Sequence, residues 1–517
     1  MKKQSRTKNS ILNLVTSVFG QFLIIALNFV TRTVFIKVLG KQYLGINGLF
    51  SDILSMLALT ELGIDTAMNF KLYKPLAQGD EKRVRLLMKF YRNAYTVVGF
   101  VILTLGLGLI PFLHLFIKDY DSLGKLGINA SLIFVMYLMQ SVSSYFFFAS
   151  RSAIVKADQK SYMLNVAGYV VTLATNLAQI AVLLISGDFI LYTGCVIIFV
   201  IIKNFINAAI AKKYYPYAFK KEKDSLDKAE VKDIFKDLGA LFVYKINSVV
   251  VKATDNMVLS TFIGLEIVGM YSNYLMIYFA VKSVVQKAYM AVKASMGNLF
   301  AVADTEEKYR FFEVMNFISA LLYGTACVGI AVLANEFILL WIGESYVIPE
   351  PFSMLVGIET LFMGLKYNLG QVRNVTGVFR QMWFRPVIGI IVNIVASVGL
   401  VQVIGIYGVV MGTILSDIFS NFMVDPSVIH KYAFDNFRPV SEYYIRNAKY
   451  GAVLLVTGLA DRFICMNLFT GHGIVSFAVH TLICGASVPA VFYLVFGRRH
   501  ECIYLINIGK RLLKRKV

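Results

Sequence analysis

The chain has 517 residues, of which 57% are hydrophobic and only 16% are charged, and its formal net charge is +20. Soluble domains carry about 25% charged residues, so this composition excludes a soluble globular protein. A disordered or linker-rich chain is also excluded, because long apolar segments recur throughout and there are only nine prolines.

Fourteen apolar segments each approach the ~20 residues that a membrane-spanning helix needs. We predict transmembrane helices over residues 10–38, 43–70, 92–117, 126–150, 161–186, 189–211, 237–263, 266–300, 310–334, 350–376, 384–404, 407–430, 447–467 and 472–496. The predicted fold class is therefore an all-α integral membrane protein with about fourteen transmembrane helices. The first apolar segment is too long for a signal-peptide core, so we expect it to be retained as a helix.

The basic residues are distributed as membrane topology requires, which explains the net charge without nucleic acid. If the N-terminus is cytoplasmic, the inner connections and both termini hold 37 of the 51 Lys and Arg residues, and the outer connections hold four. The positive-inside rule then places both termini in the cytoplasm. The longest inner connection, residues 212–236, is a basic linker, predicted either as an amphipathic surface helix or as a solvated segment.

An internal repeat relates the two halves of the chain. Residues 39–46 read LGKQYLGI and residues 263–270 read IGLEIVGM, and each segment joins two predicted helices. The first glycine can form a left-handed turn, and the second permits close packing. The repeat predicts two six-helix lobes related by pseudo-two-fold symmetry, residues 1–211 and 237–430. Residues 431–496 would add two helices, and residues 497–517 a basic tail.

Ten basic residues lie inside predicted spans, and seven of them lie where a lipid-embedded chain should have none: Arg32, Lys245, Lys252, Lys282, Lys287, Lys366 and Arg373. A Lys or Arg at the bilayer centre costs roughly 2.5–3.5 kcal/mol, so seven facing lipid would cost on the order of 20 kcal/mol. They must therefore face a wet, protein-lined interior, which implies an anionic cargo or buried counter-charges. The candidate counter-charges are Asp52, Glu61, Asp65, Asp255, Glu359 and Asp417.

Motifs for catalysis or for a metal site are missing from the sequence. The five histidines do not combine with carboxylates at ligand spacing, and no HExxH, GxSxG or Walker-type loop occurs. The five cysteines are scattered, which favours buried thiols over metal ligands or disulfides. We therefore expect no enzyme activity and no metal site.

Several motifs resemble those of a known family. Residues 60–67 (TELGIDTA) with 72–76 (LYKPL) resemble polysaccharide repeat-unit flippases (Wzx-like) of the multidrug/oligosaccharidyl-lipid/polysaccharide (MOP) exporter superfamily. Residues 39–46, 254–256 (TDN), 269–274 (GMYSNY) and 408–413 (GVVMGT), with Ser416, are similar to it as well. The resemblance implies two lobes around a cationic cavity. It also implies movement of an undecaprenyl-diphosphate-linked oligosaccharide from the inner to the outer leaflet of a bacterial plasma membrane.

Six bases form the candidate substrate site for the diphosphate: Arg32, Lys252, Lys282, Lys287, Lys366 and Arg373. Fixed Arg and Lys donors can replace the water that a diphosphate loses on its way across the membrane. No cofactor is expected beyond possible H⁺ or Na⁺ coupling, for which Glu61, Asp65 and Asp255 are the candidates. The same acids could instead hold helices together through ion pairs.

The expected partners are the lipid-linked oligosaccharide and membrane lipids. A polysaccharide polymerase and glycosyltransferases would handle the same cargo, and a monomer is the default state. One alternative is a lipid II flippase with the same fold. A drug/cation antiporter is a second, against which the basic cavity counts. A membrane-embedded polysaccharide enzyme is a third, and it would need a large outer loop.

Overall fold

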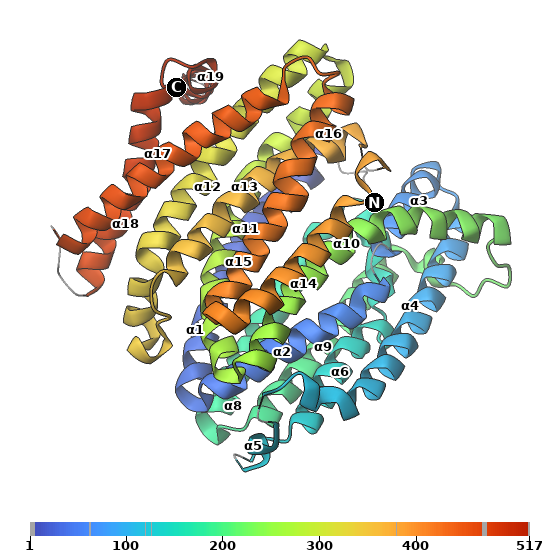
Figure 1. Ribbon diagram of the computed structural model, residues 1–517. Helices are drawn as coiled ribbons and strands as arrows, with labels where there is room; N and C mark the ends of the chain where they lie inside the picture. Colours follow the sequence, from blue (N-terminus) through green and yellow to red (C-terminus); the bar gives the residue numbers. More distant parts are fainter. Residues whose placement is uncertain are drawn as a thin grey trace. The chain divides into compact units, whose positions relative to one another are not determined.

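The computed structural model describes residues 6–61, 64–118, 120–125, 127–378, 380–467 and 473–514 (Figure 1). Every regular element in these ranges is a helix. The helices group into two compact units, Met1–Gly269 and Met270–Val517, which are described separately below.

The first unit contains ten α-helices joined by short connections. They are α1 (Arg6–Leu39), α2 (Lys41–Leu57), α3 (Ile64–Gln78), α4 (Glu81–Leu109), α5 (Tyr120–Lys125), α6 (Ala130–Phe146), α7 (Ser152–Ala157), α8 (Ser161–Ser186), α9 (Phe189–Tyr214) and α10 (Lys228–Phe262). Short 3-10 turns cover Ala58–Glu61, Ile110–Leu115, Ala149–Arg151 and Pro216–Phe219. Helix α8 packs between α1 and α9, α6 packs on α4 and α9, and α2 packs on α10.

Helix α11 (Leu265–Val302) begins at the end of the first unit and continues into the second. The second unit adds α12 (Thr305–Ile342), α13 (Phe352–Thr376), α14 (Arg385–Ile404), α15 (Ile406–Ser416), a π-helix, η7 (Asp417–Phe422), α16 (Met423–Ala433), α17 (Val440–Asn467), α18 (Ile474–Phe496) and α19 (His500–Lys514). Short 3-10 turns cover Glu344–Tyr346 and Arg380–Met382. Helix α12 packs against α13, α17, α18 and α19, and α14 packs against α15.

The predicted all-α membrane fold is confirmed. Eight helices in the described ranges are long and apolar enough to cross a membrane, or nine if the bent pair Ala130–Phe146 and Ala149–Ala157 is one span. Where they are described, the fourteen predicted spans fall on helical segments, and some, such as residues 43–70 and 407–430, are divided between consecutive helices. Helices α10, α11 and α13, which carry most of the candidate bases, are not among the eight.

The second predicted span, residues 43–70, is interrupted. Helix α2 ends at Leu57, a 3-10 turn covers Ala58–Glu61, and α3 begins at Ile64. The expectation that Glu61 and Asp65 lie four residues apart on one continuous helix is therefore wrong. The sequence has a glycine at position 63, and glycine disfavours a helix interior by about 1 kcal/mol relative to alanine.

The basic linker does not form a separate surface helix. Residues 221–227 are not helical, and Lys228 begins the long helix α10. The linker is also not freely solvated, because its acidic residues bind the start of α4. Arg85 donates to Glu222 at 3.0 Å, and Lys82 pairs with Asp224 at 2.7 Å.

The two repeat turns contact each other within the first unit. A Cβ atom at Gly45 would lie 2.0 Å from the carbonyl oxygen of Leu265, and one at Gly269 would lie 2.3 Å from the carbonyl oxygen of Lys41. Lys41 and Leu265 occupy equivalent positions of the repeat, so the two contacts are reciprocal. Only glycine permits such a close backbone approach.

Candidate functional site

In the second unit, a lysine from α13 meets the π-helix. Nζ of Lys366 lies 2.8 and 3.0 Å from the two carboxylate oxygens of Asp417. The Lys366 side chain is 41% exposed, whereas the Asp417 side chain is only 8% exposed. The Asp417 carboxylate is therefore held inside the helix packing, whereas the Lys366 ammonium group stays partly exposed.

A second, deeper cluster continues from this pair. Asp425 is fully buried and accepts from Arg373 at 3.3 Å and from Arg385 at 3.4 Å. Arg385 also donates to Asn421, and the amide of Asn421 donates to Asp417 at 2.7 Å. A continuous chain of charged and polar side chains thus connects α13, α14 and the helix over Ile406–Ala433.

The spacing of these residues explains why they meet. Lys366 and Arg373 are seven residues apart, so they lie on one face of α13. Asp417 and Asp425 are eight residues apart and face them from the neighbouring helix. The π-helix lies at this contact, and π-helical turns are frequent at functional sites.

The first unit repeats the arrangement of an exposed base on a buried acid. Nζ of Lys252, on α10, lies 3.6 Å from Oδ1 of Asp52, on α2. The other oxygen of Asp52 accepts from the amide of Asn256 at 2.5 Å. The Lys252 side chain is 51% exposed and the Asp52 side chain 7%. Each unit therefore holds one partly exposed lysine against a buried aspartate.

The other candidate bases have different surroundings. Lys282 is half-buried on α11, with Nζ 5.5 Å from the centre of the Phe279 ring, within the range of a cation–π contact. Lys287 is half-buried on the same helix. Arg32 is half-buried on α1 and interacts electrostatically with the phenol of Tyr192.

The structure brings Lys366 and Arg373 into one network in the second unit and places Lys252 beside Asp52 in the first. These three bases have carboxylate partners, which supports the alternative that some bases neutralise buried acids. A single cavity lined by all six bases stays a prediction.

Two of the three coupling candidates can be placed. Asp65, in the first turn of α3, accepts from Tyr91 at 2.8 Å and pairs with Lys156 at 3.2 Å. These contacts fit the alternative of a structural ion pair. Asp255 is buried on α10, three residues after Lys252. The side chains of Glu61 and Lys245 lie outside the described residues.

Two members of the network, Asp425 and Arg385, are not among the site residues predicted from the sequence. Asp425 lies within the predicted span 407–430 and two helical turns after Asp417, a spacing that could have revealed it. Arg385 lies at the start of the predicted span 384–404, and the positive-inside count includes it with the basic residues of the preceding inner connection. The structure places it in the first turn of α14 with its side chain buried.

No family model matches the chain, and no curated protein matches it by sequence. Among solved structures, it is similar to the lipid II flippase MurJ in an inward closed conformation, with a TM-score of 0.59 and 15% identity over 93% of this chain and 99% of that one. It is also similar to an inward-facing multidrug resistance MATE family transporter of the MOP superfamily, with a TM-score of 0.56 and 11% identity over 82% of this chain and 100% of that one. For a mutant of the Vibrio cholerae MATE transporter VcmN, the TM-score is 0.52 and the identity 13%, over 82% and 98% of the two chains.

These comparisons establish the fold. The chain has the two-lobe, all-α fold seen in these MATE and MurJ structures. A fold of this kind supports different cargoes, so the cargo must be argued from the charged side chains.

Proposed function

We propose that this chain is a flippase that moves an undecaprenyl-diphosphate-linked oligosaccharide from the inner to the outer leaflet of a bacterial plasma membrane. The oligosaccharide would be a repeat unit of a capsule, an exopolysaccharide or an O-antigen. Both termini of the protein would lie in the cytoplasm. The transporter fold and the basic residues within the helices support this proposal.

The observation that carries the proposal is the shared geometry of Lys252 with Asp52 and of Lys366 with Asp417. In both pairs the acid is buried and the base is about half-exposed. In the proposed membrane topology, an exposed ammonium group on α10 or α13 cannot face lipid without a cost of roughly 2.5–3.5 kcal/mol, so we expect it to face a wet cavity.

The buried aspartates give the empty transporter a stable form, because each lysine keeps a counter-charge when no cargo is bound. A diphosphate brings several acceptor oxygens and can bind the exposed side of the ammonium group while the aspartate holds its position. A multidrug transporter for cations would need the opposite arrangement, with the acid exposed. The geometry therefore favours an anionic cargo.

Transport would proceed by alternating access. Cargo can drive the change of state only if it binds the closing state more tightly than the open one. A lysine whose contact with the diphosphate is closer in the closing state than in the open state would provide that difference.

Binding of undecaprenyl diphosphate to the purified protein, followed by native mass spectrometry, tests the proposal. A charge-assisted hydrogen bond contributes about 1.5–3 kcal/mol, so the double variant Lys366→Gln/Asp417→Asn should bind roughly 10- to 100-fold more weakly. This variant removes both charges together and so leaves no unpaired buried acid. Arg462→Ala is the control, because it breaks the Arg462–Glu350 pair away from the site.

Unchanged binding by the double variant would contradict the proposal. Competition between lipid II and a lipid-linked repeat unit distinguishes the two candidate cargoes. Tighter binding of lipid II would favour the peptidoglycan alternative, and tight binding of a cationic dye would favour the antiporter.

A further inference from the structure

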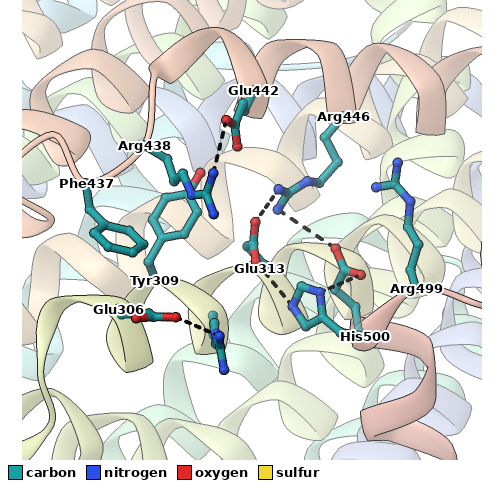
Figure 2. Close-up of a pocket in the computed structure, with 11 residues that line it drawn as sticks. Glu306, Tyr309, Glu313, Phe437, Arg438, Glu442, Arg446, Arg499 and His500 are labelled. Carbon is teal, nitrogen blue, oxygen red and sulfur yellow. Dashed lines mark hydrogen bonds and ion pairs between the residues drawn. The ribbon is translucent and has the colours of Figure 1, made fainter.

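A pocket of about 570 Å³ lies in the second unit, where the start of α12 meets α17 and α19 (Figure 2). It is separate from the ion-paired lysines described above. Within it, Glu313 of α12 and Glu501 of α19 each lie within ion-pair distance of His500. Figure 2 shows Glu313 beside His500. The proposed transport mechanism uses none of these three residues.

In both Glu313 and Glu501, the two carboxylate oxygens face different neighbours. The Oε1 atoms of Glu313 and Glu501 face the guanidinium of Arg446, which is hydrogen-bonded to Glu313 and lies 4.0 Å from Glu501. Oε2 of Glu313 lies 3.2 Å from Nε2 of His500, and Oε2 of Glu501 lies 3.3 Å from Nδ1 of the same ring. One carboxylate oxygen from each of two helices therefore converges on an imidazole.

Each acid thus lies near one imidazole nitrogen, and a small rotation of the ring would bring one nitrogen and both carboxylates around a single small metal ion. Zinc binds imidazole nitrogen and carboxylate oxygen at about 2.0–2.2 Å, so neighbouring ligands in a tetrahedron lie about 3.4 Å apart. One ligand atom from each of Glu313, His500 and Glu501 lies within 4.8 Å of the others. The His500 side chain is 52% exposed, so its ring has room to turn toward a shared ion.

A second observation also points to a missing cation. Oε2 of Glu501 is buried and accepts no hydrogen bond of normal geometry from the described part of the chain; its nearest polar neighbour is Nδ1 of His500, at 3.3 Å. A buried carboxylate oxygen without a donor costs about 1–3 kcal/mol or more.

We propose that Glu313, His500 and Glu501 form a binding site for a divalent transition metal ion, of which Zn²⁺ fits the ligands best. An imidazole with two carboxylates suits zinc better than magnesium or calcium, which prefer oxygen ligands alone. The fourth ligand is a water molecule from the open pocket. Arg446 orients both carboxylates through their other oxygens, as residues around a metal site commonly do.

The site joins the C-terminal helix α19 to the membrane-spanning helix α12. Cys502, two residues after His500, already packs in an apolar cluster with Phe492 and Phe496. A metal bond would add a polar attachment at the start of the same helix. Sequence spacing could not predict the site, because Glu313 lies far from His500 along the chain.

The test uses the full-length detergent-purified protein with any polyhistidine tag removed and bound metal stripped by a chelator. Isothermal titration with ZnCl₂ should give one ion per chain, and a Co²⁺-loaded sample should show the visible absorption of a tetrahedral site. His500→Ala and Glu501→Gln should each weaken binding at least tenfold. Glu442→Gln is the matched control, since Glu442 lines the same pocket but pairs with Arg438.

Equal zinc affinity in the wild type, His500→Ala and Glu501→Gln would overturn the proposal. So would a wild-type protein that binds no zinc and gives no tetrahedral cobalt spectrum, and the cluster would then be an ion-pair network only. The wild-type spectrum keeps the test decisive if a variant fails to fold.

Discussion

The α-carbon of Gly45 packs directly on the backbone carbonyl of Leu265, and the reciprocal contact joins Gly269 to Lys41. The turn between α1 and α2 therefore meets the turn between α10 and α11 through equivalent positions of the internal repeat. Gln42 and Glu266, which are also equivalent, are hydrogen-bonded at 3.4 Å. This reciprocity is what a pseudo-two-fold relation between the two turns requires.

Substitution at these glycines should be costly. Gly45→Ala and Gly269→Ala each place a methyl group against a backbone oxygen that cannot move independently, so we expect destabilisation of about 1–3 kcal/mol. Thermal unfolding of the purified protein measures the loss. Gly108→Ala on α4 is the control, because its Cβ atom would meet nothing within 4 Å. Equal melting temperatures for all three variants would contradict the close packing of the turns.

The two aspartates of the second unit should differ in their effect on stability. Asp425→Ala leaves two largely buried guanidinium groups without their shared carboxylate, and breaking a buried pair in this way costs about 3–5 kcal/mol. Asp417→Ala should cost less, because Lys366 is about half-exposed and water can solvate it. Denaturation of the two variants under identical conditions gives the comparison. A smaller loss for Asp425→Ala would contradict the assigned network.

The fold was largely predictable from sequence, whereas the partners of the charged residues were not. Apolar length alone located the helices, because a lipid-facing segment must satisfy its backbone hydrogen bonds internally. The repeat motif correctly identified the glycine turns. Residue periodicity placed Lys366 and Arg373 on one face of α13, but it could not show which acids lie opposite. Those contacts depend on the packing of α13 against the helix over Ile406–Ala433, and the π-helix there shifts the register.

The docking of the linker on α4 should depend on pH at its extremes only. A hydrogen bond from Arg85 lowers the pKa of Glu222, and one from Lys82 lowers the pKa of Asp224, while Asp224 raises the pKa of Lys82. Lowered carboxyl pKa values contribute stability above about pH 4, and that contribution is lost as the pH falls through them. The raised pKa of Lys82 contributes below about pH 10 and is lost as the pH rises through it.

Hydrogen exchange over residues 221–227 checks this prediction. Protection of the segment should be constant from about pH 5 to pH 9, after correction for intrinsic exchange. It should fall in about 1 M salt, because the Lys82–Asp224 pair is exposed and salt screens exposed charges. Lys89→Ala should lower protection as well, since Nζ of Lys89 donates to three linker carbonyl groups. Protection that is insensitive to salt would show that the ion pairs do not hold the linker.

Variants of Asp255 and Asp65 test whether each acid couples transport to an ion gradient or only stabilises the helix packing. If Asp255 exchanges H⁺ or Na⁺, Asp255→Asn should transport cargo without any dependence on the ion gradient. Asp65→Asn should mainly lower stability, because Asp65 already binds Tyr91 and Lys156. Transport by reconstituted vesicles under imposed pH and Na⁺ gradients distinguishes the two. Unchanged gradient dependence in Asp255→Asn would remove this residue from the coupling mechanism.

In the proposed mechanism, the exposed lysines of both units bind the diphosphate of a lipid-linked saccharide while the protein moves it across the bilayer. The most direct measurement is the movement of a fluorescent undecaprenyl-diphosphate oligosaccharide between leaflets of proteoliposomes, detected by a membrane-impermeant quencher. Wild-type protein and Lys252→Arg should transport the cargo, Lys252→Glu and Lys366→Glu should be reduced at least tenfold, and Arg462→Ala should match the wild type. Full transport by both charge-reversed variants would contradict the account.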